Sequence, residues 1–168
     1  MRYGLMIALV LAWVGTGWGA GSVWEIKGLK GLGGVRVQID KLPSVATQDG
    51  LYEDQLKTDV ELRLRKVGIR VLSEEERLKE PGKPYLSVTT LVAKNETGVY
   101  AVSVHAEILQ YVLLDRDRLL GVTAGSTWSH GVVINVVANK MPTAVRSYLG
   151  DIVDVFINDF LTANPVQR

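Results

Sequence analysis

The fold is decided by residues 99–114, VYAVSVHAEILQYVLL, an unusually long run rich in β-branched and aromatic residues. Before it come a β-rich run from Tyr85 to Ala93 and the turn signal Asn95-Glu96-Thr97-Gly98. After it come the polar turn 115–118, DRDR, and a third β-rich run from Leu119 to Val133. Three such runs joined by short turns predict an antiparallel meander.

Two segments with helical periodicity lie on either side of the meander. From about Asp49 to Val67, apolar residues recur three or four positions apart, and acid–base pairs four apart occupy the other side. Gly68 is suited to end this helix in a left-handed conformation. From Pro142 to Ala163 the spacing is again helical and the segment is more apolar. The second helix is therefore expected to pack across the sheet.

Shorter elements precede the meander. Val35, Val37 and Ile39 alternate with polar residues and predict a half-buried first strand, and the segment 69–71 predicts a short second one. Ser73 and Glu76 match a capping box, which predicts a short helix. The order β-α-β-(short α)-β-β-β-α predicts an α+β fold. We expect one domain, residues 35–165, with a mixed, mainly antiparallel sheet of about five strands and two long helices on one face.

The amino terminus has the pattern of an export signal. Arg2 is followed by the apolar run 5–14 and then by small residues, which predicts a signal peptide over residues 1–20. The apolar run is short for a bilayer span, although retention as an uncleaved anchor stays open. Residues 21–34 contain five glycines and predict a flexible leader. The expected location is periplasmic or extracellular, with membrane contact only transiently through the signal.

Composition excludes several classes of protein. The chain of 168 residues contains no cysteine, so a disulfide scaffold and a cysteine-bound metal centre are excluded. With 19 basic and 18 acidic residues, it lacks the positive charge that a nucleic-acid binder uses to neutralise phosphates. The sequence contains two histidines and no Gly-x-Ser-x-Gly motif, so no nucleophilic triad is indicated. We therefore expect no catalytic residues and no cofactor.

The two histidines raise the question of a metal site. If the turn at 115–118 is a regular hairpin, His105 lies opposite Trp128 and His130 lies opposite Ser103. Both histidines then share one sheet face. A one-residue bulge would put them on opposite faces, because a slip of one residue reverses every side chain.

A shared face would give His105, Glu107 and His130 the chemistry of a divalent-metal site. A small metal-dependent or hydrolytic enzyme is therefore an alternative function. Partly exposed histidines that stabilise cross-strand pairs are the simpler interpretation, so we expect no metal here.

Two tryptophans, Trp24 and Trp128, remain after removal of the signal. Both are candidates for contact with a partner, since tryptophan is enriched at interfaces. For Trp128, which lies in a predicted strand, burial in the core is the simpler interpretation. Trp24 lies in the predicted leader, where packing explains it less well.

The order of elements resembles that of small bacterial cell-envelope domains. The residues that carry the resemblance are the strand 35–39, the helix that begins near Gly50-Leu51 and contains Leu56 and Leu64, and the segment 68–71, followed by the meander and the closing helix. In this order the chain is similar to lipopolysaccharide-assembly lipoproteins and to the amino-terminal domain of the Tol-system propeller protein. It lacks the cysteine that is lipidated in the lipoproteins. The resemblance implies a non-enzymatic envelope protein that binds a larger partner.

The expected function is therefore that of an exported binding or accessory domain of the cell envelope, which acts through a protein partner. The metal-dependent enzyme is one alternative. A structural subunit that self-associates through an uncovered sheet face or strand edge is another.

Overall fold

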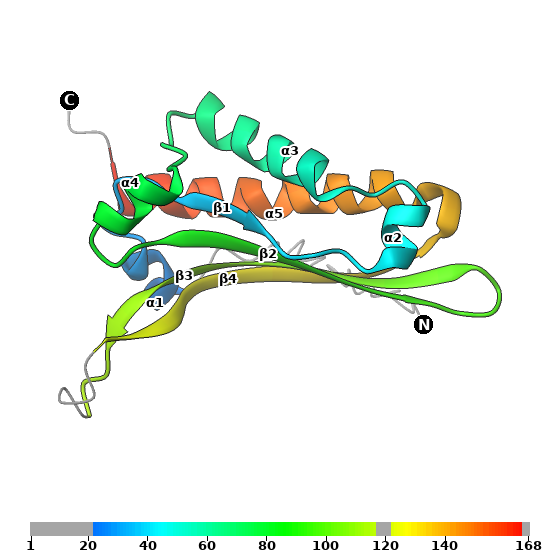
Figure 1. Ribbon diagram of the computed structural model, residues 1–168. Coiled ribbons are helices and arrows are strands. Elements are labelled where there is room, and N and C mark those ends of the chain that lie inside the picture. The colour runs from blue at the N-terminus through cyan, green and yellow to red at the C-terminus, as the bar shows by residue number, and fades with distance from the viewer. Residues whose placement is uncertain (1–21, 117–121, 166–168) are drawn as a thin grey trace, which may run out of the picture.

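The protein has an α+β fold in which one mixed sheet is covered on one face by two long helices (Figure 1). The computed structural model describes residues 22–116 and 122–165. The sheet has the order β1-β2-β3-β4, with β1 parallel to β2 and the other pairs antiparallel. The strands are Arg36–Ile39 (β1), Tyr85–Lys94 (β2), Val99–Leu113 (β3) and Val122–Val137 (β4).

The helices confirm the expected pair of long elements. α3 spans Glu53–Lys66 and α5 spans Met141–Ala163. The shorter helices are α1 (Val23–Gly28), α2 (Ser44–Gln48), α4 (Glu74–Lys79) and the 3₁₀ turn η2 (Ala138–Lys140). Gly68 follows α3 with φ +81°, as expected, and the Ile69 N–H closes the end of the helix by donating to the carbonyl of Leu64. The capping box of α4 is also present.

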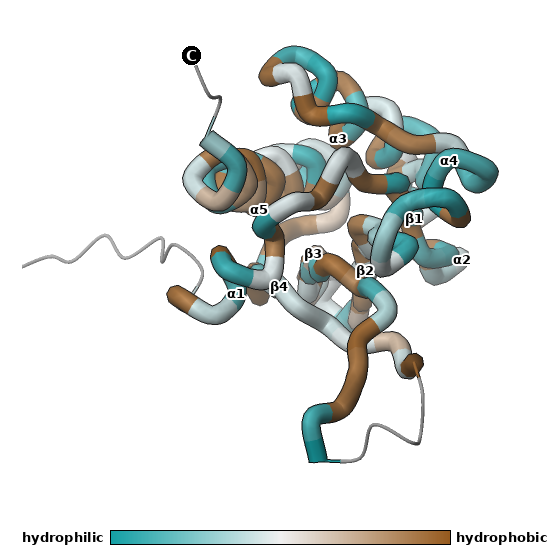
Figure 2. The backbone as a smooth tube through the Cα atoms, turned by 90° about the vertical axis from the view of Figure 1, so that its left-hand side faces the viewer, coloured by the Kyte–Doolittle hydropathy of each residue, from teal (hydrophilic) through white to brown (hydrophobic). Residues whose placement is uncertain are grey.

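The core lies between the sheet and the long helices. Alternate residues of β3 point toward the helices and are fully buried, namely Tyr100, Val102, Val104, Ala106 and Ile108. They pack with a stripe on α5 whose members include Val145, Leu149, Ile152, Phe156 and Phe160. The tube in Figure 2 shows α5 over the β3–β4 side of the sheet and α3 on the β1 side. Each large apolar side chain buried in this way contributes about 1.5–3 kcal/mol.

Over the residues that the structure describes, the sheet has four strands, where about five were expected. The segment 69–71 makes one isolated parallel bridge, between Val35 and Val71. The Val35 N–H donates to the carbonyl of Arg70, and the Leu72 N–H donates to the carbonyl of Val35. The segment cannot extend as a strand, because Ser73 immediately caps α4.

Part of the expected flexible leader is ordered. Ser22 and Glu25 form a capping box at the start of α1, and Leu29 is fully buried. Asn164, at the end of α5, accepts from the N–H of Gly31 and donates to the carbonyl of Leu29. The five glycines predicted a flexible segment, but the contacts of a few non-glycine residues are enough to order it. The expected signal peptide, residues 1–20, lies outside the described residues.

Candidate functional site

The sheet face that points away from the helices is the first candidate surface. We call it the open face. Its side chains on β2, β3 and the second half of β4 alternate with the core residues and pair across the strands, as in Leu91 with Ser103 and Ser103 with Val133. Within the described residues, no helix packs against this face (Figures 1 and 2).

The open face is apolar at the end nearest the β2–β3 turn. Leu91 is 63% exposed and Val133 is 74% exposed. Around them lies a shallow hollow of about 290 Å³, lined by Pro43, Leu91, Val92, Ala93, Ala101, Val102, Ser103 and Val133. None of the described residues that line this hollow is charged. It therefore offers an apolar contact area and no group that could carry out acid–base chemistry.

The predicted register of the β3–β4 hairpin was wrong. His105 pairs with Gly131, and His130 pairs with Ala106. A register shift lies between Ile108 and Leu109. The two strands are therefore offset from the regular hairpin that the 115–118 turn suggested. The two histidines consequently lie on opposite faces, as the bulge alternative anticipated.

This register separates the proposed metal ligands. His105 and Glu107 are on the open face, whereas His130 is on the helix side, with its ring centroid 6.5 Å from that of Trp128. Among residues 22–116 and 122–165, no group of three or more histidine, aspartate or glutamate side chains could hold a metal ion together. The geometry therefore gives no support to an enzyme built on this trio.

Trp128 is a core residue. It is 1% exposed, packs edge-on against Phe156 with ring centroids 5.1 Å apart, and donates from Nε1 to Asp159 at 2.9 Å. Trp24, the other candidate contact residue, is 78% exposed on α1, where Lys27 lies over its ring. Of the two tryptophans, only Trp24 is thus accessible to a partner.

The outer edge of β4 is partly covered by α1. The Oε1 atom of Glu25 accepts from the backbone N–H of Ser129 at 3.2 Å, and Gln110 donates to the carbonyl of Gly28 at 3.0 Å. The N–H groups of Ser22 and Ser129 hold the pKa of the Glu25 carboxyl below its ordinary value. These contacts cover β4 near Ser129 and leave its carboxyl-terminal half without such a helix.

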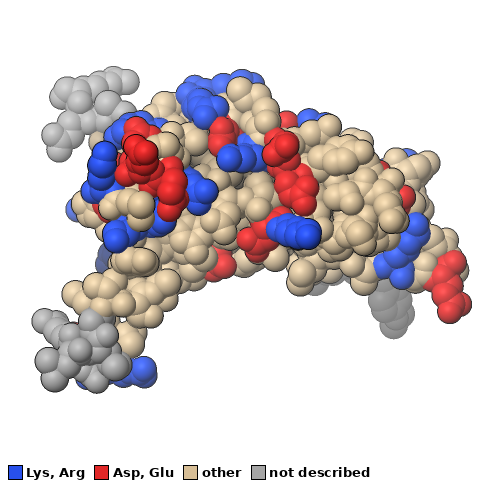
Figure 3. Space-filling model, in the orientation of Figure 1, with Lys and Arg blue, Asp and Glu red and all other residues tan. Residues whose placement is uncertain are grey.

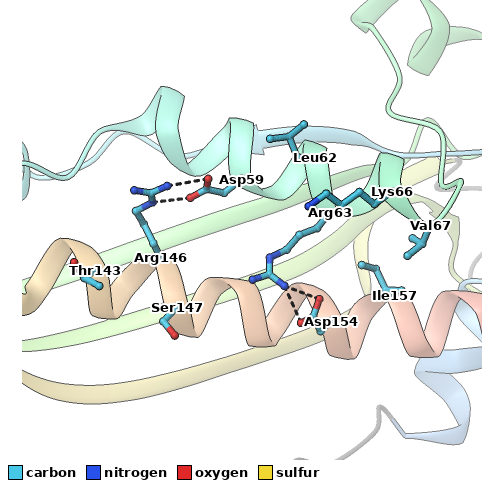
Figure 4. A pocket seen from close by; sticks show the side chains of 10 residues that line it. All are labelled: Asp59, Leu62, Arg63, Lys66, Val67, Thr143, Arg146, Ser147, Asp154 and Ile157. Atoms are coloured by element: carbon cyan, nitrogen blue, oxygen red, sulfur yellow. Dashed lines mark hydrogen bonds and ion pairs between the residues drawn. The ribbon is translucent and has the colours of Figure 1, made fainter.

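A hollow of about 630 Å³ lies between α3 and α5 (Figure 4). Two ion pairs join the helices across it. Arg63 contacts both carboxylate oxygens of Asp154 at 2.8 and 2.9 Å, and Arg146 contacts those of Asp59 at 2.7 and 3.0 Å. Since these four charges satisfy one another, we interpret the hollow as a bridged helix–helix contact. Sequence periodicity could not reveal these pairs, because it shows only neighbours on the same helix.

Charges of both signs are mixed on the surface around α4. Glu74 pairs with Arg36 and Arg77, and Arg70 pairs with Glu76 and Glu80. Figure 3 shows basic and acidic side chains interspersed on the part of the surface where α4 lies in Figure 1. Such a surface is typical of a solvated face and gives no footprint for phosphate binding.

No helix in the described residues is long and apolar enough to cross a bilayer. Comparison with protein-family models and with curated proteins found no match to the chain.

Proposed function

We propose that this chain is an exported, non-enzymatic binding domain of the cell envelope that acts through a protein partner. Export rests on the signal pattern of residues 1–20. The proposal of a protein partner is supported by the apolar part of the open face.

The observation that carries the proposal is the exposure of Leu91 and Val133 around a hollow whose described lining residues are all uncharged. A sheet face that is not covered by helices is normally polar. Apolar side chains clustered on such a face mark an interaction site more often than isolated ones do. The hollow is shallow and apolar, which suits the side chains of a protein better than a polar small molecule.

Capture of a partner from envelope extract tests the proposal. The full-length chain is expressed with a carboxyl-terminal tag, and the variant Leu91→Ser is compared with Leu78→Ser. Leu78 is also an exposed leucine, 48% accessible, but it lies on α4. The proposal expects one partner that the wild type and Leu78→Ser retain and Leu91→Ser loses. Equal capture by both variants, or no saturable partner, would contradict it.

Export is checked separately by the mass of the mature protein. Removal of about twenty residues, with the product found outside the cytoplasm, supports export. A full-length chain that stays in the cytoplasm contradicts it.

A further inference from the structure

The two edges of the sheet are protected to different degrees. The β1 edge is four residues long, and Arg36 on it pairs with Glu74 at 3.2 Å. The β4 edge is sixteen residues long and contains neither a charged residue nor a proline. Edge strands are usually shortened, charged or covered to prevent pairing with other chains. Among residues 22–116 and 122–165, only α1 covers β4, and it does so near Ser129.

The uncovered hydrogen-bonding groups of β4 can be identified from Ser129. Its N–H donates outward, to Glu25. Backbone groups of an antiparallel edge strand alternate between its neighbour and the outside, and the register is regular from Ser129 to Val137. The N–H and C=O groups of Gly131, Val133, Asn135 and Val137 therefore also point outward. In the described part of the chain, no helix or loop backbone bonds to them.

We propose that this edge pairs with the same edge of a second copy of the chain, in antiparallel orientation about a two-fold axis at Ile134. Gly131 then faces Val137 of the second copy, and Val133 faces Asn135 of the second copy. Every outward group in this stretch gains a partner, since each facing pair exchanges two backbone hydrogen bonds. The contact is self-complementary, as a two-fold interface requires.

The length of the uncovered stretch favours a second copy. At one end the stretch stops at Ser129, where α1 covers the edge, and at the other it stops at Val137, where η2 leaves the sheet. In the proposed register, Val137 of the second copy reaches Gly131 and goes no further. The second strand thus ends where α1 begins.

The side chains of this stretch also suit the contact. Val133 and Val137, on the open face, are 74% and 47% exposed, and each would gain a cross-strand neighbour on the same face while the face itself stays open. On the helix side, Val132, Ile134 and Val136 are only partly buried against the core. No charge from β4 would be desolvated. The two sheets would form one continuous sheet, which brings both open faces to the same side.

The first test is the oligomeric state of the full chain after removal of the signal, by analytical ultracentrifugation. The variant Asn135→Pro removes the outward N–H, a change that edge strands tolerate, whereas its control Asn135→Ala keeps it. We expect a dimer for the wild type and for Asn135→Ala. For Asn135→Pro we expect the dimer dissociation constant to rise at least about tenfold, because each copy loses a hydrogen bond. Near-ultraviolet circular dichroism confirms that both variants fold.

A cysteine scan of residues 131–137 tests the register of the dimer independently of the proline variant. The chain has no native cysteine, so each variant has a single thiol. Under copper-phenanthroline oxidation, Ile134→Cys should form the disulfide-linked dimer fastest, since position 134 lies opposite itself and only close Cα atoms can be bridged. Val132→Cys is the control, because it lies opposite position 136.

A wild-type monomer at millimolar concentration would overturn the inference. The inference would also be overturned if Leu91→Ser disrupts the wild-type dimer, Asn135→Pro leaves the dissociation constant unchanged, and cross-linking in the cysteine scan is not fastest at position 134. Neither result bears on the proposed protein partner, because that proposal is tested separately by capture from envelope extract.

Discussion

The two faces of the sheet are made by alternate residues of the same strands, and they differ in almost every physical respect. On β3, Tyr100 and Val104 are fully buried against the helices, whereas their neighbours Ala101 and His105 point to the open face. The helix-covered face provides the stability of the fold. The open face can therefore vary in sequence at little cost in stability, which leaves it free for the binding function that we propose.

The largest expected effect is that of a cavity under α5. Phe156 is fully buried and contacts the rings of Trp128 and Phe160. We expect Phe156→Ala to lower the free energy of unfolding by about 3–5 kcal/mol. Urea denaturation measures this change. Leu161→Ala, at a 39% exposed position of the same helix, serves as the control and should change it by less than about 1 kcal/mol.

A smaller effect is expected at the buried hydrogen bond between Trp128 and Asp159. Asp159 is 3% exposed and accepts the indole N–H. Asp159→Ala leaves this donor without its acceptor and should cost about 1–3 kcal/mol. Asp159→Asn retains an acceptor oxygen and should cost less. Equal losses for the two variants in urea denaturation would show that the hydrogen bond is not what stabilises this position.

Local patterns were sufficient to predict the elements of the helix-covered face. The spacing of Leu56, Val60 and Leu64 predicted α3, and Gly68 predicted its end, because both signals depend on nearby residues. The expected second strand, at 69–71, makes only one isolated bridge, because the helix that Ser73 caps starts immediately after it.

The candidate site was harder to predict, because it depends on register. The histidines were placed by assuming a regular hairpin, and a single shift near Ile108 moved His130 to the helix side. The docking of α1 depends on a contact between Glu25 and Ser129, which are 104 residues apart in the chain. Local sequence patterns cannot predict such a long-range contact. The exposure of Leu91 could not be predicted either, because the pattern of an alternating strand does not show which of its faces the helices will cover.

The contact between α1 and β4 should depend on pH. The pKa of Glu25 in the folded chain is lower than its ordinary value, chiefly because of the Ser22 N–H. A depressed pKa contributes stability that is complete above the unfolded-state pKa and is lost as pH falls through the folded-state pKa. We expect the amide resonance of Ser129 to titrate with a midpoint below the ordinary value of 4.5 in an NMR series.

Glu25→Gln is the control for this titration. It keeps an acceptor but removes the charge, so the acid transition at Ser129 should disappear. The accompanying loss of stability should be about 1 kcal/mol, the scale of a surface-proximal hydrogen bond. Persistence of the transition in Glu25→Gln would assign it to another carboxylate.

The smallest expected effect is at Leu91, and it compares the two faces most directly. Leu86 and Leu91 lie on the same strand, but Leu86 is fully buried on the helix side and Leu91 is 63% exposed on the open face. Leu91→Ala should change the free energy of unfolding by about 0.5 kcal/mol or less, whereas Leu86→Ala should cost about 2–5 kcal/mol. Thermal and urea denaturation measure both. A large loss at Leu91 would mean that the open face contributes to folding, and the exposure of Leu91 would then no longer indicate a binding surface.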